Sequence, residues 1–432
     1  MPQTPLLSEI TNRSVPFADI SDFTPLIDVI KDKRIVMLGE STHGTKEFYE
    51  WRNLLTAELI RNHGFNFIAI EGDWPPAEQV NKFVHGKAGE SSFAALTEFS
   101  RWPTWMWGNA EMVGFMDFLK GWNQTHGTQV GFHGLDVYSL FESIEQVIEG
   151  LRKLNPKLAK RIKSQYACFD PYWNNERAYT RSLLNYSDGC GKQVGQVFEE
   201  LKRIQDPNSS EWINIVQNAR IVKNAESYYH AMTLHNDESW NIRDRHMLET
   251  LDSLLANYGK NSKAVIWEHN THVGDYHATD MIAQGQVNLG GLAREQFGRH
   301  NVALVGFTTF KGSVMASNMW DGPMKKMDLP SARAGSLEAT LHEAIPFVGN
   351  SDYYLLFDQV QDGSPLKDYR GHRAIGVVYR SHPENRAHYV PSAVADRYDA
   401  LVFIDETSAL TPLRLNFDPR KVPETYPFGT RI

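Results

Sequence analysis

An acidic side chain and a histidine lie three residues apart in Gly39-Glu-Ser-Thr-His-Gly44, directly after a short apolar run. A free histidine titrates near neutral pH, so His43 is suited to take a proton from water, and a carboxylate such as Glu40 can orient it. The apolar run is typical of a buried strand, and the residues after Thr45 have helical periodicity. The sequence therefore predicts that this strand-to-helix turn forms the core of a hydrolytic active site.

Further ionisable side chains follow the next predicted strands. In open parallel sheets, ligands bind beyond the carboxyl ends of the strands, so side chains at these ends are expected to converge. The ends carry Glu71 and Asp73, then Asp136, then Glu268, His269 and His272. We expect Glu40, His43, Glu71, His269 and His272 to be catalytic and Asp136 to contact the substrate. A chance run of solvated loop residues is the alternative.

Arg52 lies within the apolar stripe of the helix predicted after Thr45. The apolar positions of that stripe are Phe48, Trp51, Leu55 and Leu59. An arginine that faces the core needs a carboxylate partner, because an unpaired buried charge is costly. We therefore expect Arg52 to form a functional ion pair with Glu40 or Glu71. The alternative is an arginine at the helix flank that extends its charge into solvent.

Three other chemistries fit the turn less well. A phosphate-binding loop needs Lys and then Ser or Thr directly after its second glycine, whereas here the order is Thr45-Lys46. A nucleophile elbow is one residue shorter than Gly39 to Gly44, so Ser41 is expected to cap the helix rather than attack the substrate. The acidic and histidine side chains are ligand types for a divalent metal, but no His-Glu-x-x-His helix or cysteine pair fixes a spacing. We expect no metal or other cofactor, with a catalytic divalent metal as the alternative.

Three tryptophans crowd into Arg101-Trp-Pro-Thr-Trp-Met-Trp-Gly108. Aromatic side chains offer broad apolar contact with polar tips, which suits a pocket for a bulky ligand. We therefore expect Trp102, Trp105 and Trp107 to bind the substrate. A loop that its tryptophans anchor in the core is the alternative, and the two are not exclusive.

Apolar runs that alternate with helical stretches predict an α/β fold with a mostly parallel central sheet flanked by helices. From about residue 140 to 260 strand signals vanish and amphipathic helices take over. We expect a discontinuous α/β catalytic domain, 1–139 and 261–432, and a helical insertion, 140–260, that forms one wall of an active-site cleft. The predicted strands cover 34–40, 65–71, 130–136, 264–268, 302–307, 353–357, 374–379 and 400–404.

The composition of the 432-residue chain limits its partners. A net charge of -8 argues against a nucleic-acid partner, which would need a basic face. No stretch approaches a membrane span, and the first residues lack a secretory signal. Cys168 and Cys190 could form one bridge, but unpaired thiols in a reducing compartment explain them more simply. We expect a cytoplasmic protein, with a monomer favoured and a small-molecule substrate.

The motifs together resemble those of the erythromycin esterase family, whose relatives include succinoglycan biosynthesis proteins. The resemblance runs from about residue 20 to 414. It rests on Leu38-Gly-Glu-Ser-Thr-His-Gly-Thr-x-Glu47-Phe48, Ile68-Ala-Ile-Glu71-Gly and Trp267-Glu-His-Asn-Thr-His272, with further matches at Trp105-x-Trp107, Glu111, Gly134-Leu-Asp136, Arg243-Asp-Arg245, Met247, Gly335-Ser336-x-Glu338 and Asp399–Asp405.

The resemblance implies a hydrolase that opens the macrolactone ester of 14-membered macrolides such as erythromycin and so confers antibiotic resistance. It implies that His43 activates water without a covalent intermediate, with Glu71 or Glu40 as its carboxylate. The oxyanion donors would come from Arg52, His269 or His272. His272 as the base with His43 assisting stays open, as do another ester or a glycan-related substrate and a non-hydrolytic accessory role in polysaccharide metabolism.

Overall fold

A computed structural model describes residues 4–127, 129–184, 189–204, 209–233, 238–380 and 386–413. Its centre is a nine-stranded sheet in the order β1-β8-β11-β6-β2-β5-β3-β4, with β7 paired to β6. The strands are β1 (Ser14–Pro16), β2 (Ile35–Leu38), β3 (Phe67–Asp73), β4 (Gly131–Asp136), β5 (Ala264–Trp267), β6 (Val302–Ala316), β7 (Lys325–Leu329), β8 (Tyr353–Leu356) and β11 (Ala400–Thr407). The run from β11 through β6, β2, β5 and β3 to β4 is parallel, and β1, β7 and β8 pair antiparallel. The predicted α/β fold with a mostly parallel sheet is thus confirmed.

Alternating side chains of the central strands feed two separate cores. Val36 and Leu38 of β2 point to one face of the sheet, and Ile35 and Met37 point to the other. The first face is covered by α2 (Thr24–Ile30), α3 (Lys46–His63) and α6 (Ala110–Thr125). The second is covered by α1 (Pro5–Arg13), α12 (Glu238–Tyr258), α14 (Leu289–Phe297) and α15 (Leu337–Val348). Apolar residues on both faces explain why these strands are continuous hydrophobic runs in the sequence.

The helix after β2 begins and ends where its sequence predicts. α3 follows Thr45 and ends at Gly64, which adopts a left-handed conformation with φ 73°. That backbone conformation favours glycine and closes helices readily. The defined ends of α3 therefore fix the position of Arg52 beside the end of β2.

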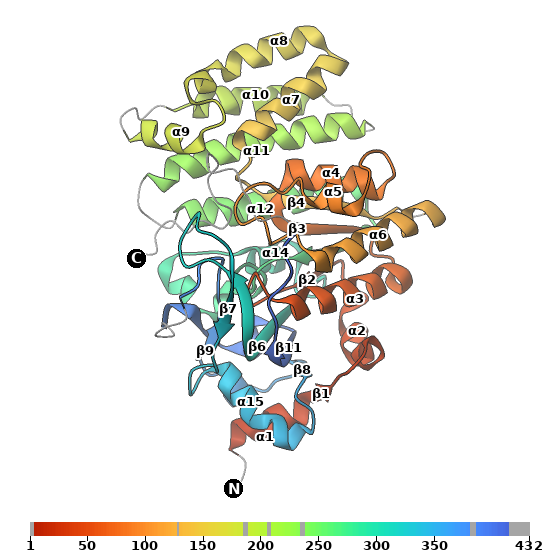
Figure 1. Cartoon of the computed structure of the whole chain (residues 1–432), viewed down its shortest axis with the longest axis vertical. Helices are drawn as coiled ribbons and strands as arrows, with labels where there is room; N and C mark the ends of the chain where they lie inside the picture. Colours follow the sequence, from red (N-terminus) through yellow and green to blue (C-terminus); the bar gives the residue numbers. More distant parts are fainter. Residues whose placement is uncertain are drawn as a thin grey trace.

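A stack of helices lies beyond the β4 edge of the sheet, at the top of Figure 1. It comprises α7 (Leu140–Leu154), α8 (Pro156–Gln165), α9 (Glu176–Leu183), α10 (Gly191–Arg203) and α11 (Ser210–Met232), which share their own apolar core. α12 lies between this stack and the sheet, and its Met247, Leu251 and Leu255 belong to the second core of the sheet. Within the helical segment predicted from 140 to 260, the helices α7 to α11 thus form a separate stack, whereas α12 packs on the sheet.

Smaller elements connect this framework. α4 (Trp74–Val84) and α5 (Ser92–Leu96) follow β3, while α13 (Asn270–Val273) follows β5 and α16 (Val394–Arg397) precedes β11. β9 (Arg370–Arg373) and β10 (Tyr389–Ser392) form a separate two-stranded sheet. The prediction of a strand over 374–379 is wrong. Ile375 and Val378 make only single parallel bridges, to Thr42 and Ser317, which lie beyond the ends of β2 and β6, so the segment forms no continuous ladder with the main sheet.

The expectation of unpaired thiols is also wrong, because Cys168 and Cys190 form a disulfide within the helical stack. Their separation of 22 residues gave no measure of the distance between them. Cys168 lies in a 3-10 helix, Tyr166–Tyr172, and Cys190 lies directly before α10, and the packing of the helical stack brings the two together. No helix in the described ranges is long and apolar enough to cross a membrane.

Candidate active site

The Gly39–Gly44 turn is tied to neighbouring segments by backbone hydrogen bonds. The Gly39 amide donates to Val305, the Ile375 amide donates to the Ser41 carbonyl, and the Leu410 amide donates to the Gly44 carbonyl. A Cβ on Gly39 would lie 2.1 Å from Asn270 Oδ1, and one on Gly44 would lie 1.9 Å from the Met315 carbonyl oxygen. Both positions require glycine because the neighbouring chain comes this close. The turn is therefore a fixed platform for the side chains it carries.

Glu40, His43 and Arg52 form the first half of the site. Arg52 Nη2 donates to Glu40 Oε2 at 2.6 Å, so the predicted ion pair of Arg52 is present and its partner is Glu40. Glu40 Oε1 lies 2.9 Å from His43 Nδ1. Because a carboxylate only accepts, Nδ1 carries the proton and Nε2 keeps its lone pair. Arg52 is fully buried and its guanidinium lies over the Tyr49 and Trp267 rings, which fixes Glu40 from behind.

Glu71 lies at the centre of the second half. Its Oε1 accepts from Arg243 Nη2 at 2.8 Å and lies 4.0 Å from His43 Nε2, and its Oε2 accepts from the His269 amide at 2.8 Å. Burial alone would raise the pKa of Glu71, but His272, His43, Arg243 and the His269 amide hold that pKa well below its usual range. Glu71 is therefore ionised in the folded protein at every pH near neutral.

Arg243 joins Glu71 to the predicted substrate residue Asp136. Its Nε and Nη2 donate to the two oxygens of Asp136 at 2.9 and 2.6 Å, and its Nη1 lies 3.0 Å from His272 Nε2. Burial would lower the pKa of Arg243, but Asp136, Tyr138 and Glu71 raise it well above its usual value. Asp136, which is fully buried, thus holds Arg243 in place and reaches the reacting centre only through it.

The two later histidines lie on opposite sides of Glu71. His272 Nε2 lies 3.5 Å from Glu71 Oε1, and the His269 ring lies 4.8 Å from the His43 ring. His269 Nδ1 accepts from the Thr271 amide, so Nε2 carries the proton. That Nε2 is buried and has no hydrogen-bond partner among the described residues. Burial, with His43 and His272 nearby, lowers the pKa of His269 well below its usual value, which keeps the ring neutral and Nε2 a donor.

Glu268 contributes an uncharged acid behind this centre. It is fully buried, and neither carboxyl oxygen has a hydrogen-bond partner in the described part of the chain. Burial, together with Glu71, Asp244 and Asp136, raises the pKa of Glu268 well above its usual value. The residue therefore adds no charge to the site at neutral pH.

The six side chains predicted to be catalytic thus lie in one buried cluster at the carboxyl ends of β2, β3 and β5. They are Glu40, His43, Arg52, Glu71, His269 and His272, each exposed by 4% or less. Sequence reasoning assigned no role to Arg243 and Asp244, which reach the cluster from α12. A signal for Arg243 existed, since it lies three residues after Trp240 and four before Met247 in an apolar stripe, as Arg52 does in α3.

The three predicted substrate tryptophans are packed in the core beside this polar cluster, and Trp107 contacts the backbone of Glu71. Trp102, Trp105 and Trp107 are exposed by 2% or less and belong to the first core of the sheet. Trp102 Nε1 donates to the Gly322 carbonyl, and Trp107 Nε1 donates to the Glu71 carbonyl. In this conformation they anchor the 101–108 loop in the core, and Trp107 also fixes the backbone of Glu71.

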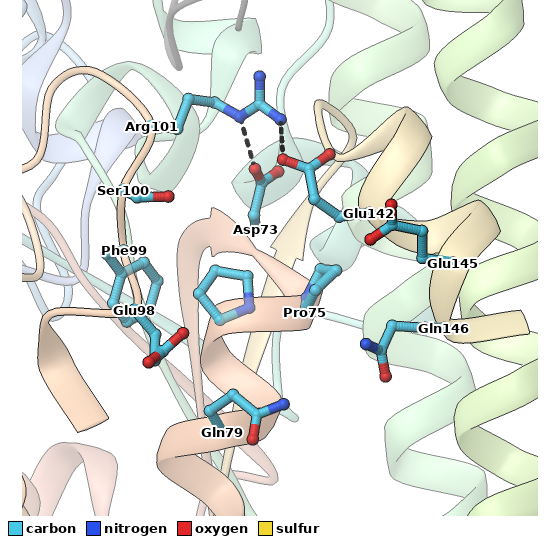
Figure 2. Close-up of a pocket in the computed structure, with 11 residues that line it drawn as sticks. Asp73, Pro75, Gln79, Glu98, Phe99, Ser100, Arg101, Glu142, Glu145 and Gln146 are labelled. Atoms are coloured by element: carbon cyan, nitrogen blue, oxygen red, sulfur yellow. Dashed lines mark hydrogen bonds and ion pairs between the residues drawn. The ribbon is translucent and has the colours of Figure 1, made fainter. Parts of the chain in front are cut away.

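A cavity of about 190 Å³ lies between the end of β3 and α7 (Figure 2). Arg101 joins its walls, because it donates to Asp73 at 2.7 Å, to Glu142 of α7 at 3.0 Å and to Glu176 of α9 at 3.3 Å. Burial, with Glu142 and Asp136 nearby, raises the pKa of Asp73 to about 6 although Arg101 opposes this. Through Arg101 this cluster connects the sheet to the helical stack. It lies directly beside Asp136, because Asp73 is paired with Asp136 in the sheet.

A divalent metal would need several free donors that converge on one point. Among the described residues, no group of three or more His, Cys, Asp or Glu side chains has that arrangement. The carboxylates of Glu40, Glu71 and Asp136 are each engaged by an arginine instead. These carboxylate oxygens, which could otherwise bind a metal, are thus already engaged in ion pairs.

Comparison with known proteins adds a family. The family model described as erythromycin esterase matches residues 60–407, a segment that begins after Glu40, His43 and Arg52. Erythromycin esterase type II of Escherichia coli is 25% identical over 134 residues, which cover 30% of this chain and 30% of that enzyme. Putative hydrolase YbfO of Bacillus subtilis (strain 168) is 20% identical over 353 residues, 76% of each chain.

Solved structures share the fold. A succinoglycan biosynthesis protein superposes with a TM-score of 0.77 at 20% identity, covering 94% of this chain and 97% of that one. An erythromycin esterase mutant in its open conformation superposes with a TM-score of 0.63 at 16% identity, covering 93% and 96%. At these identities the superpositions establish the architecture alone.

Proposed function

Since the chain belongs to the erythromycin esterase family, we propose that it hydrolyses the macrolactone ester of 14-membered macrolides, using water activated by His43. Family membership supports a hydrolase, and the macrolide substrate is the finer part of the proposal. One observation carries the mechanism: Glu40 fixes the proton of His43 on Nδ1, which leaves the Nε2 lone pair directed at the side of the site where Glu71 lies.

Water is held between a base and an anion in this mechanism. His43 Nε2 and Glu71 Oε1 are 4.0 Å apart, a separation that one water can bridge with two hydrogen bonds of about 2.8 Å. Glu71 orients the water and His43 takes its proton while the water oxygen attacks the ester carbonyl. The ionised Glu71 also stabilises the imidazolium that forms on His43.

The tetrahedral oxyanion then needs a hydrogen-bond donor. His269 supplies one, because its Nε2–H is buried, has no partner among the described residues and belongs to a ring stacked 4.8 Å from His43. Collapse of the intermediate breaks the carbon–oxygen bond of the ester, and the imidazolium of His43 returns its proton to the leaving alkoxide. The product is one ring-opened hydroxy acid, which contains the atoms of one water more than the lactone. Arg52 takes part only by holding Glu40.

The test is to incubate the purified protein with a panel of 14-membered macrolides and follow the products by mass spectrometry. We expect a product heavier by one water, absent with His43→Ala and present with His300→Ala, whose side chain is exposed. An inactive wild-type protein across the whole panel would exclude macrolide hydrolysis. Expression in a sensitive bacterium should likewise raise its erythromycin tolerance.

A second candidate is hydrolysis of a different ester by the same residues. The burial of Trp102, Trp105 and Trp107 favours it, because the aromatic side chains expected to bind a macrolide ring are packed in the core. Turnover of smaller aryl or sugar esters, with macrolides untouched and with loss of activity in His43→Ala, would identify this alternative.

A further inference from the structure

A second carboxylate–histidine pair lies across Glu71 from Glu40 and His43. His272 Nδ1 lies 2.9 and 3.1 Å from the two oxygens of Asp244, and His272 Nε2 lies 3.0 Å from Arg243 Nη1. Arginine can only donate, so Nε2 must accept and the proton must reside on Nδ1, from which it is donated to Asp244. The two contacts together define a neutral ring with one tautomer, and its lone pair is already occupied by Arg243.

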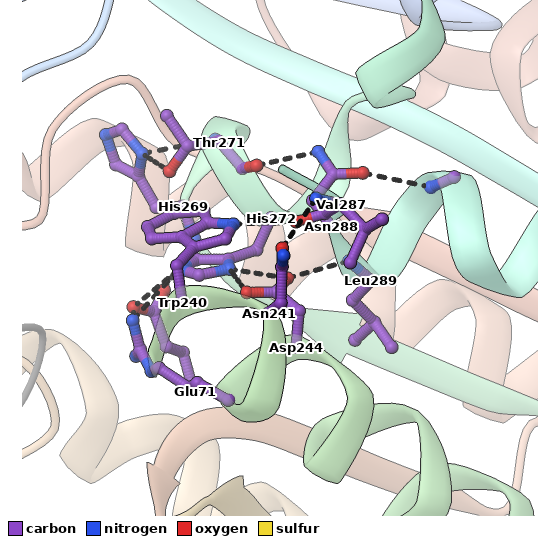
Figure 3. Close-up of polar contacts among 12 residues, drawn as sticks. Glu71, Trp240, Asn241, Asp244, His269, Thr271, His272, Val287, Asn288 and Leu289 are labelled. Carbon is purple, nitrogen blue, oxygen red and sulfur yellow. Dashed lines mark hydrogen bonds and ion pairs between the residues drawn. The ribbon is translucent and has the colours of Figure 1, made fainter. Parts of the chain in front are cut away.

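Asp244 has no freedom to move away from this ring. It is fully buried on α12, and its Oδ1 also accepts from the Leu289 amide at 2.8 Å, at the start of α14. Trp240, one turn earlier on α12, stacks on the His272 ring with centroids 4.6 Å apart and an angle of 10° between the planes. Its Nε1 donates to the Val287 carbonyl at 2.6 Å. His272 is therefore held at its edge by Asp244 and on its face by Trp240 (Figure 3).

The segment that these residues contact is itself fastened on both sides. Asn241 donates to the Gly285 carbonyl at 3.0 Å and accepts from the Val287 amide at 2.9 Å. Asn288 donates to the carbonyl of Thr271 at 2.7 Å and also to that of Gly274. Thus α12, residues 285–289 and α13 form one hydrogen-bonded unit around His272, drawn in Figure 3.

We propose that Asp244 and Trp240 are positioning residues that hold His272 as a neutral, Nδ1-protonated ring, so that His272 orients Arg243 toward Glu71 instead of serving as the base. Asp244 orients His272, His272 orients Arg243, and Arg243 in turn orients Glu71. Glu71 is the anion that holds the attacking water in the proposed hydrolysis. The link to rate rests on that proposed function, whereas the protonation of His272 does not. This assignment also separates the two histidines chemically: the Nε2 lone pair of His43 is available, and that of His272 is engaged.

Asp244→Asn tests the chain of contacts directly. The Asn oxygen can take the place of Oδ1, which accepts from the Leu289 amide and lies 2.9 Å from His272 Nδ1. The Nδ1 proton of His272 is then held by one neutral oxygen instead of a carboxylate, while Arg243 still donates to Nε2. Nitrogen and proton NMR of isotope-labelled histidines, with the His272 signals assigned through His272→Gln, should report an Nδ1–H tautomer in the wild type and an upfield shift of the Nδ1 proton in Asp244→Asn, because its hydrogen bond is weaker. This readout needs no substrate.

Activity gives the second readout. We expect Asp244→Asn to lower kcat by about 10- to 100-fold with KM nearly unchanged, as for other residues that orient a catalytic group through one neighbour. Trp240→Phe, which keeps a stacked ring, should retain more activity than Trp240→Leu. Asp252→Asn, at an exposed position of the same helix, is the matched control.

The two readouts separate the possible failures. A wild-type His272 that carries its proton on Nε2, or an Nδ1 proton signal that Asp244→Asn leaves unchanged, would overturn the positioning proposal whatever the activity. Absence of hydrolysis by the wild type together with the expected NMR signals would instead reject the proposed function and leave the assignment of His272 in place.

Discussion

Replacement of Glu40 by glutamine changes one atom and should disable His43. Arg52 donates to Glu40 Oε2 at 2.6 Å, and His43 Nδ1 donates to Oε1 at 2.9 Å. In Glu40→Gln the amide oxygen must face Arg52, because arginine cannot accept a hydrogen bond. The amide NH₂ then faces Nδ1, which must accept, so the proton of His43 moves to Nε2. A ring protonated on Nε2 cannot take a proton from water.

The size of the loss follows from what the carboxylate does. It fixes the tautomer and stabilises the imidazolium, which together contribute roughly 10³- to 10⁴-fold to kcat, or about 4–5 kcal/mol of transition-state stabilisation. KM should change little, since Glu40 is buried behind His43 and is exposed by only 1%.

The assay is steady-state ester hydrolysis, with thermal unfolding measured in parallel to show that the variant is folded. Glu58→Gln, a more exposed position of the same helix α3, should retain wild-type activity. A folded Glu40→Gln protein with kcat within a few-fold of the wild type would refute the role given to the Glu40–His43 pair.

Four further predictions concern stability and the oxyanion donor. Arg52→Met leaves Glu40 buried without its cation and should cost about 3–5 kcal/mol of unfolding free energy, measured by denaturant titration; a cost below about 1 kcal/mol would contradict the burial argument. The pKa of Asp73 is raised from 3.8 to about 6. The stability that the protonated Asp73 contributes is therefore present below about pH 4 and is lost as the pH rises through 6, by at most about 3 kcal/mol. Asp73→Asn should flatten the plot of unfolding free energy against pH over that range, and an unchanged slope would contradict the prediction. His269→Phe removes the Nε2 donor and should lower kcat by about 10²- to 10³-fold; an unaffected kcat would assign the oxyanion to another group. Reduction of the Cys168–Cys190 disulfide, or Cys168→Ser, should destabilise the helical stack by about 3 kcal/mol for a loop of 22 residues, which unfolding with and without reductant would detect.

Local patterns in the sequence were enough to locate much of the site. Buried parallel strands are apolar throughout, so the ends of β2, β3 and β5 were recognisable, and with them Glu40, Glu71 and the two later histidines. Arg52 was recognisable because a charge in an apolar helical stripe needs a buried partner. Both inferences use information contained within a few consecutive residues.

The parts of the site and of the fold that could not be predicted depend on contacts between segments far apart in the sequence. Arg243 and Asp244 approach the cluster from a helix far along the chain, and no local pattern states which strand end that helix will face. The apolar run 374–379 has strand-like composition, but it makes only isolated bridges to residues beyond the ends of two strands. The tryptophans of the 101–108 loop have the same composition whether they line a pocket or anchor a loop, so their packing in the core of the sheet could not be predicted from composition.

The central claim is that His43, oriented by Glu40, activates water for direct attack on an ester. Its most direct test is hydrolysis of erythromycin in water enriched with heavy oxygen, with the wild type and His43→Ala compared by mass spectrometry. The account predicts one heavy oxygen atom in the new carboxylate after a single turnover, and a rate at least about 10³-fold lower in His43→Ala. Incorporation only after several turnovers would point to covalent attack by an enzyme carboxylate, and an undiminished rate in folded His43→Ala would contradict the assignment of the base.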